Sequence, residues 1–422
     1  MKKFLGVILA LTMLAALLAG CADSGANAGT TAATTAATTA AATAATTAAA
    51  SGVDVSTLKV GFIFLHDENS TYDKNFMDAA KAVQAKLGLS DDQVMFKTNI
   101  PESSECYEAA AELVDAGCNL VFADSFGHED FMIQAAEEFP DVEFCHATGT
   151  QAHTRNLPNF HNAFASIYEG RYLAGIAAGM KINEMIASGE ITEDEAKMGY
   201  VGAYPYAEVK SGYTSFFLGA KSVCPSVTME VMFTNSWFDI ALEKEAANSL
   251  ISNGCILISQ HADSEGAPKA CEENGVPNVA YNISTISMGP NTALISSKIN
   301  WEPYFEVIVN AVLNGEAIPA DYCMSLSDGG VVLTELNAAV AAEGTQEAID
   351  EATAKFLAGE LKVFDTATFT VGGETLTSYM ADVDSDASFT PDTEAIADGY
   401  FHESEYRSAP YFDIDIDGIT TK

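Results

Sequence analysis

Short apolar runs alternate with amphipathic segments through most of this chain, and no other feature constrains its fold as strongly. The run LKVGFIFL (58–65) is followed by apolar residues at helical spacing over 73–88. Further strand-like runs lie at 93–100, 119–123, 141–147 and 160–165, with helical patterns at 103–116 and 128–138 between them. Strands this short and apolar, separated by helices, predict a parallel sheet covered on both faces.

The alternation starts afresh at KMGYVGA (197–203), which predicts a second lobe. We assign residues 54–165 to lobe 1 and residues 166–289 to lobe 2, and we expect residues 290–314 to return to lobe 1. With 422 residues the chain suits two such domains. Residues 315–422 have a different pattern, with strand-like stretches at 362–371 and 411–418, and we interpret them as a C-terminal appendage.

The N-terminus predicts export and a lipid anchor. Two lysines precede an apolar run from Phe4 to Ala19, and the run leads into LAGC, which ends at Cys21. This pattern is typical of a lipoprotein signal peptide over 1–21, with Cys21 as the lipidated residue. Residues 22–53 are almost only Ala, Thr, Ser and Gly, which predicts a flexible tether. We therefore expect an extracytoplasmic protein attached to the cell membrane through its lipid alone.

The charge of the chain excludes one class of partner. The 59 acidic and 20 basic residues give a formal net charge of -39. A nucleic acid would be repelled by such a chain, so no nucleic-acid binding is predicted.

The motifs of cofactor and catalytic sites are absent. There is no GxGxxG, GxxxxGK[ST], HExxH or GxSxG, so we predict no cofactor, no ATPase activity and no enzyme. His261, Asp263 and Ser264 are too crowded along the chain to align as a catalytic triad. The seven cysteines after Cys21 have no zinc spacing and are odd in number, so neither a metal site nor a disulfide framework is predicted.

Polar and aromatic side chains follow nearly every predicted strand. In doubly wound sheets ligands bind outside the carboxyl ends of the strands. The candidate ligand-binding residues at these ends are Tyr72, Asp73, Phe76, Ser125, Phe126, Tyr206, Trp237, Gln260, His261, Asp263 and Asn282.

These candidates favour a flat, neutral ligand. Rings can stack on a planar heterocycle such as a purine, while carboxylates and amides bind its edge, and Lys and Arg are scarce at the strand ends. Other roles stay open for single residues. Each ring could pack in a core, Asp73 or Asp239 could cap a helix, and Asp263 or Ser264 could cap the helix that begins near Glu265.

Several spaced motifs resemble one known family. SFGHEDFMIQAAEEFPDVEFCHATG, YEGRYLAG, NSWFD, QHADS and INWEPYF occur in this order after the lipobox. Together they closely resemble the basic membrane protein family of ABC-transporter substrate-binding lipoproteins, which is related to purine nucleoside receptors. The resemblance implies an α/β type I periplasmic-binding-protein fold, with two doubly wound parallel-sheet lobes joined by crossovers and a ligand between them.

One stretch departs from the family pattern. Where many relatives carry an aspartate pair, this chain has Asn282 and Ser284. If those aspartates hold ribose hydroxyls in relatives, the departure favours a free nucleobase over a nucleoside here.

The resemblance also implies partners. We expect a receptor that captures a purine or related heterocycle and delivers it to ABC permease and ATPase subunits. The alternative is a ligand-sensing or regulatory lipoprotein of the same fold whose output is not uptake.

Overall fold

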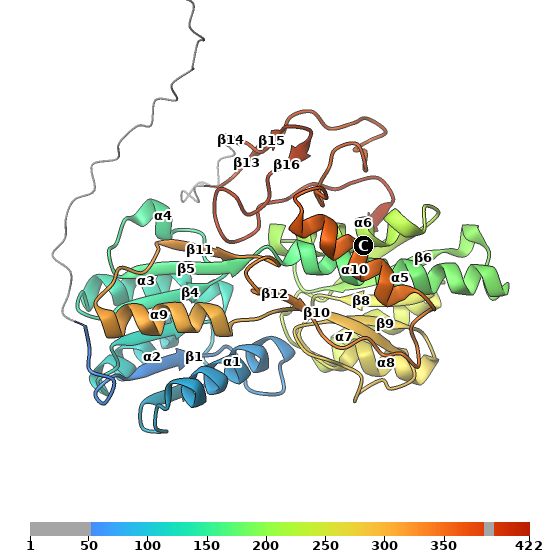
Figure 1. The fold of residues 1–422 in the computed structure, drawn as a ribbon. Coiled ribbons are helices and arrows are strands. Elements are labelled where there is room, and N and C mark those ends of the chain that lie inside the picture. Colours follow the sequence, from blue (N-terminus) through green and yellow to red (C-terminus); the bar gives the residue numbers. More distant parts are fainter. Residues whose placement is uncertain (1–51, 384–391) are drawn as a thin grey trace, which may run out of the picture. The chain divides into compact units, whose positions relative to one another are not determined.

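The computed structural model describes residues 52–383 and 392–422. The expected signal peptide, Cys21 and nearly all of the expected tether lie outside these residues. Figure 1 shows the two parallel sheets and the helices that cover them.

The first sheet has six strands, all parallel to their neighbours. In sheet order they are β11 (Asp321–Met324), β5 (Phe160–Ala165), β4 (Glu143–Ala147), β3 (Leu120–Ala123), β1 (Val60–Ile63) and β2 (Val94–Lys97). Successive side chains of β1 serve different layers, since Phe62 packs in one core and Ile63 in another. The first core contains residues of α1 (Thr71–Leu87) and α9 (Glu302–Asn314), and the second contains residues of α2 (Ser104–Asp115) and α3 (Glu129–Glu138). Helices therefore cover both faces, as the continuous apolar strands predict.

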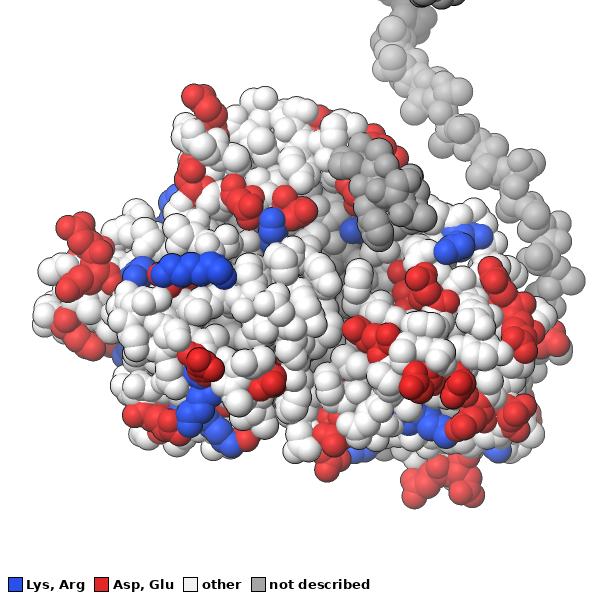
Figure 2. Space-filling model, turned by 180° about the vertical axis from the view of Figure 1, so that it is seen from behind, with Lys and Arg blue, Asp and Glu red and all other residues white. Residues whose placement is uncertain are grey.

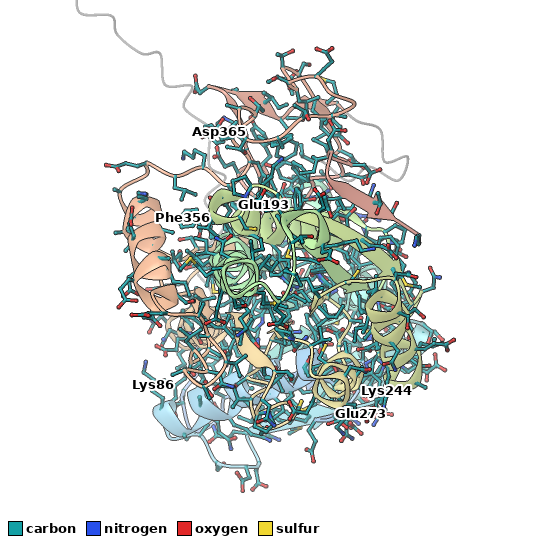
Figure 3. The ribbon with its side chains drawn as sticks, turned by 90° about the vertical axis from the view of Figure 1, so that its right-hand side faces the viewer. Lys86, Glu193, Lys244, Glu273, Phe356 and Asp365 are labelled. Atoms are coloured by element: carbon teal, nitrogen blue, oxygen red, sulfur yellow. The ribbon has the colours of Figure 1, made fainter. Side chains whose placement is uncertain are left out.

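The second sheet has seven strands and is parallel except at β12. In sheet order they are β12 (Val331–Leu333), β10 (Ala293–Ile299), β9 (Asn278–Tyr281), β8 (Leu257–Gln260), β6 (Lys197–Gly202), β7 (Thr228–Phe233) and β17 (Ile419–Thr421). One of its cores contains residues of α5 (Ile167–Ser188) and α6 (Ala207–Val223). The other contains residues of α7 (Ile240–Ser252) and α8 (Gly266–Asn274). On the outer surface of these last two helices, Lys244 and Glu273 form an ion pair of 2.6 Å (Figure 3).

The chain crosses between the sheets after β5, after β10, and again between β11 and β12. These two doubly wound lobes confirm the predicted α/β periplasmic-binding fold. Among the described residues no helix has the length and apolarity needed to cross a membrane. Acidic side chains outnumber basic ones on the face shown in Figure 2, in line with the net charge.

The prediction that residues 290–314 return to lobe 1 is wrong for their strand, β10. β10 pairs with β9 and β12, so it belongs to the second sheet. The crossing follows it, where Asn75 of α1 donates a hydrogen bond of 2.8 Å to the Ile299 carbonyl. A buried strand has the same apolar pattern in either sheet, and only its hydrogen-bond partners decide where it lies.

The C-terminal segment is not a separate appendage. β11 extends the first sheet, while β12 and β17 extend the second. Helix α10 (Thr345–Leu357) packs against α5. The ring of Phe356, which is labelled on α10 in Figure 3, lies 5.7 Å from the ring of Tyr172 between centroids.

The strands predicted at 362–371 and 411–418 do not form. Between residues 362 and 418 the described strands form two short antiparallel pairs, namely β13 (Met380–Ala381) with β14 (Thr393–Glu394) and β15 (Ile396–Ala397) with β16 (Tyr400–Phe401). In YFDIDIDG the isoleucines are buried and the aspartates exposed, so the alternation is present. Alternating apolar and polar residues indicate which side chains face a core, but a strand also needs a hydrogen-bonded neighbouring strand.

Candidate functional site

Loops from both lobes meet around one cleft at the carboxyl ends of the strands. Its space is about 350 Å³, with the open mouth included. The lining residues are Leu65, His66, Tyr72, Asp73, Ser125, Phe126, Thr148, Glu208, Trp237, His261 and Asp263. The first seven belong to lobe 1 and the last four to lobe 2, and no Lys or Arg is among them.

The lobes are closed on each other in this structure. The backbone N–H of Thr71 donates a hydrogen bond of 2.8 Å to the carbonyl of Asp263 in the other lobe. The rings of His66 and Phe238 lie 5.2 Å apart, and those of Phe126 and Tyr206 lie 5.5 Å apart. A ligand would therefore be enclosed between the lobes and not held on one surface.

Asp73 is fixed by the start of α1. Ser70 is the N-cap of this helix, and its hydroxyl donates to Asp73 Oδ2 at 2.5 Å. The backbone N–H of His66 donates to Asp73 Oδ1 at 2.7 Å. The carboxylate is thus held at the cleft wall with only 1% of the residue exposed. The helix cap is Ser70, and Asp73 is oriented by it.

The loop after β3 positions Ser125 and Phe126. Glu102 accepts hydrogen bonds from Ser125 Oγ at 2.6 Å and from the N–H of Gly127 at 2.7 Å. The phenol of Tyr72 donates to the carbonyl of Asp124 at 2.8 Å. These contacts leave the Phe126 ring 38% exposed at the mouth of the cleft.

The polar residues after β8 have separate roles. The amide of Gln260 donates to the carbonyls of Ala262 and Ser264, which braces the loop from within. Ser264 Oγ accepts from the N–H of Gly266 at 3.0 Å and so supports the start of α8. The Asp263 side chain faces the cleft and accepts from Asn282 Nδ2 at 3.3 Å. The N-cap position of α8 is Glu265, so Ser264 supports the helix start from the residue before it, and neither Ser264 nor Asp263 is the N-cap itself.

A buried chain of contacts runs from α5 to the cleft. Arg171 is 1% exposed, donates to the Gln260 carbonyl at 2.9 Å, and lies 3.1 Å from His261 Nδ1. Because a guanidinium has only donors, His261 Nδ1 must accept, which leaves its proton on Nε2. That nitrogen lies 3.2 Å from Glu208 Oε1. Glu208 is thereby held at the cleft wall.

Burial shifts the pKa values of the site. It raises the pKa of Asp263 well above its usual value, and the neighbouring carboxylates of Glu243 and Asp73 add to the effect. It also raises the pKa of Asp124, together with the nearby Asp73 charge. The pKa of His261 is lowered, mainly by burial, so its ring is neutral. The site is rich in carboxyl groups, and a ligand that offers N–H donors would satisfy them.

Aromatic rings form one side of the mouth. Trp237 lies 5.1 Å from Tyr204 and 6.0 Å from Tyr206, and the two tyrosine rings are stacked at 5.1 Å. With Phe126 opposite, these rings offer flat apolar faces.

Most predicted site residues meet here, but four do not line the cleft. Phe76 is fully buried and stacks on Trp301 at 4.4 Å, so it is a core residue. Gln260 braces its loop, and Asn282 lies behind Asp263 as its hydrogen-bond donor. Tyr206 lines a neighbouring space that opens from the cleft.

Sequence reasoning missed Glu208, His66, Leu65 and Thr148. Glu208 comes shortly after the AYPY stretch and lies in the first turn of α6, so its position after a strand was a usable signal. Thr148 has a φ of 63°, which is rare for a β-branched residue and has no sequence signature.

No cluster of His, Cys, Asp and Glu suited to a metal ion occurs in residues 52–383 and 392–422. All seven cysteines in this part of the chain are free.

Two lobes of parallel sheet with a cleft at their strand ends are the architecture of periplasmic-type solute-binding proteins. The chain belongs to the family described as ABC transporter substrate-binding protein PnrA-like, whose model matches residues 63–365. The predicted membership is confirmed.

Similar proteins include a purine-binding protein of Brucella abortus, 32% identical over 73% of this chain and 83% of the relative. A putative ABC transporter glucose-binding protein of Haloferax volcanii is 33% identical over 55% of this chain and 56% of the relative. Among solved structures, a solute-binding protein of an ABC transporter system from Aeropyrum pernix shares the fold. Its TM-score is 0.61 at 17% identity, over 73% of this chain and 93% of the other.

Proposed function

We propose that this protein captures a purine between its lobes and delivers it to an ABC permease. The observation that carries the proposal is the lining of the cleft, where ring faces stand beside Asp73, Glu208 and Asp263 and neither Lys nor Arg is among the lining residues. The edge of a purine offers N–H donors to such acceptors, and its faces stack on rings. The purine-binding relative from Brucella supports the same ligand class.

A sugar is the second candidate, because a relative of similar identity is named a putative glucose-binding protein. Carboxylates and rings also suit a hydroxyl-rich ligand. One experiment separates the two: mass spectrometry of the small molecule released when freshly purified protein is denatured. A purine supports the proposal, and a hexose would overturn it.

Delivery to a permease can be tested in cells. Loss of the protein should abolish uptake of the labelled ligand. If uptake continues unchanged while a cellular response to the ligand disappears, the protein is a sensor of the same fold.

We also propose that the protein is extracytoplasmic and anchored through Cys21. Cys21→Ser should then abolish labelling by a fatty-acid probe and release the protein from the membrane. Labelling that persists in this variant would contradict the anchor, and Cys118→Ser is the matched control that should keep it.

A further inference from the structure

The C-terminal segment reaches across the mouth of the cleft. Residues between 379 and 413 supply one wall of an outer space of about 1040 Å³, open solvent included. This space adjoins the cleft at Phe126, Thr148 and Glu208. The wall lies beyond residue 365, where the match to the family model ends. Residues 401–413 are the part of it that contacts both lobes, and we call them the strap.

Both ends of the strap are fixed to lobe 2. Phe401 and Phe412 belong to the same buried core as Phe216 of α6. At the second end, Lys210 of α6 forms an ion pair with Asp413 at 2.8 Å. Because its two ends are held by one lobe, the strap has to move with lobe 2.

The middle of the strap contacts lobe 1. The backbone N–H of Ser408 donates a hydrogen bond of 3.0 Å to Oδ2 of Asp321, the first residue of β11. His153 Nδ1, on α4 (Ala152–Arg155), lies 3.8 Å from the same oxygen. Burial raises the pKa of Asp321, and hydrogen bonding from Ser408 and the nearby His153 and Arg407 oppose this rise. Ser408 is only 1% exposed, so little water competes for this charge-assisted hydrogen bond.

The charges on the two sides of this contact are complementary. Burial lowers the pKa of Arg407, the residue before Ser408. The carboxylates of Asp382 and Glu403 in the C-terminal segment and of Asp321 and Glu129 in lobe 1 oppose this effect. The guanidinium thus interacts with carboxylates of both the strap and lobe 1, which favours the docked position of the strap.

The contact between Ser408 and Asp321 spans the hinge. The chain passes from β11 in the first sheet to β12 in the second between Met324 and Val331. Asp321 lies on the lobe 1 side of this connection, and the strap lies on the lobe 2 side. Hinge opening rotates one lobe against the other and separates groups that are held on opposite sides. Opening of the cleft should therefore break this hydrogen bond.

We propose that the strap latches the two lobes in the closed state, with the contact between Ser408 and Asp321 as the bond that breaks before the cleft opens. Such a latch shifts the balance between closed and open molecules toward the closed state, and it slows the release of a bound ligand. The inference goes beyond the proposed function, since the latch acts on whatever ligand the cleft encloses.

Acrylamide quenching of tryptophan fluorescence in the ligand-free full chain tests the latch. The chain has two tryptophans, of which Trp301 is 1% exposed and Trp237 lines the cleft. Opening of the lobes should expose Trp237 to the quencher and leave Trp301 buried. Trp237→Phe should remove most of the quenching, which assigns the signal to the cleft.

Asp321→Ala removes the acceptor of the latch. Loss of a hydrogen bond to a charged group should shift the ratio of open to closed molecules about tenfold or more. The quenching constant should therefore rise about twofold or more. Asp321→Leu removes the same acceptor but fills the space of the side chain, so it should give the same rise. Asp141→Ala is the matched control, because it removes an exposed carboxylate of lobe 1 and should keep the native quenching.

Melting temperatures of the variants show which of them are folded. Native quenching in a folded Asp321→Ala or Asp321→Leu protein would refute the latch, and so would an equal rise in Asp141→Ala. No ligand is present in this experiment, so its failure leaves the proposed function intact. Conversely, a ligand other than a purine would overturn the proposed function and leave the latch intact.

Discussion

The polar side chains after β8 are neighbours in sequence but contact different parts of the structure. Gln260 turns inward to brace the loop, Ser264 supports α8, and Asp263 faces the cleft. Their shared polarity therefore has a structural cause for Gln260 and Ser264, while the Asp263 side chain lies at the cleft wall.

Asp263→Asn tests the role at the cleft. If the Asp263 carboxylate accepts a ligand N–H, its replacement by an amide should cost about 1–3 kcal/mol of binding free energy. We expect roughly tenfold weaker binding and a changed order of preference among adenine, guanine and hypoxanthine in titration calorimetry. Ser264→Ala is the control and should lower the melting temperature without changing the order. An unchanged order in Asp263→Asn would contradict recognition by this residue.

Trp237→Ala tests the ring wall. Stacking of a base on an aromatic ring is worth about 1–3 kcal/mol in other base-binding proteins, so binding should weaken about tenfold. The apo melting temperature should change little, because Trp237 is only partly buried. Phe76→Leu provides the contrast, since that ring is fully buried and its loss should mainly lower stability. A large loss of apo stability with intact affinity would make Trp237 a core residue.

At the scale of elements, α7 and the loop after β8 are joined by one buried carboxyl group. Glu243 is fully buried, and its oxygens accept from the N–H groups of Ser264 at 3.0 Å and Asp239 at 3.1 Å. Asp239 caps α7 by accepting from Ala241 and Leu242, as its position before the helix suggested. The cleft loop is thus tied to the start of α7.

This tie predicts a dependence of stability on pH. Burial raises the pKa of Glu243 from 4.5 to about 7, so the folded state holds this proton more tightly than the unfolded state. The contribution to stability is present below about pH 4.5 and is lost as the pH rises through about 7. In Glu243→Gln the melting temperature of the apo protein should therefore fall less between pH 5 and pH 8 than in the native chain. Glu245→Gln, on the exposed side of α7, should leave the native pH dependence intact, and equal slopes in all three proteins would contradict the prediction.

At the scale of the whole molecule, residues 366–422 of the C-terminal segment are part of the second lobe. Phe369, Phe401 and Phe412 belong to the same core as Phe216 of α6, and β17 completes the sheet beside β7. The segment also reaches lobe 1 through Asp321, so it contacts both sides of the cleft mouth.

Removal of residues 366–422 should therefore damage the fold. Loss of one buried aromatic side chain typically costs about 3–5 kcal/mol, and a domain has only about 5–15 kcal/mol in total. We expect the truncated chain to aggregate or to melt at least 10 °C lower by calorimetry, where about 2–4 °C corresponds to 1 kcal/mol. Deletion of Lys422 alone removes one ion pair with Glu230 and one backbone hydrogen bond to Val231. It should lower the melting temperature far less, because Glu230 keeps Lys197 and Asn253 as partners. A truncated chain with the native melting temperature would contradict this expectation and support the interpretation of these residues as a separate appendage.

The two lobes and most of the cleft follow from local patterns along the chain. Apolar strands alternating with helices allow few arrangements, and the ends of parallel strands meet at one edge of a sheet. The pattern of the chain alone therefore brings together Tyr72, Asp73, Phe126, Trp237 and Asp263, all of which line the cleft.

Other features of the molecule follow only from its three-dimensional packing. These are the sheet to which β10 belongs, the direction of the Gln260 and Phe76 side chains, the contacts that lead from Arg171 to Glu208, and the wall built by residues 379–413. Each of them depends on partners distant in sequence, and local patterns of polarity carry no information about which distant groups meet.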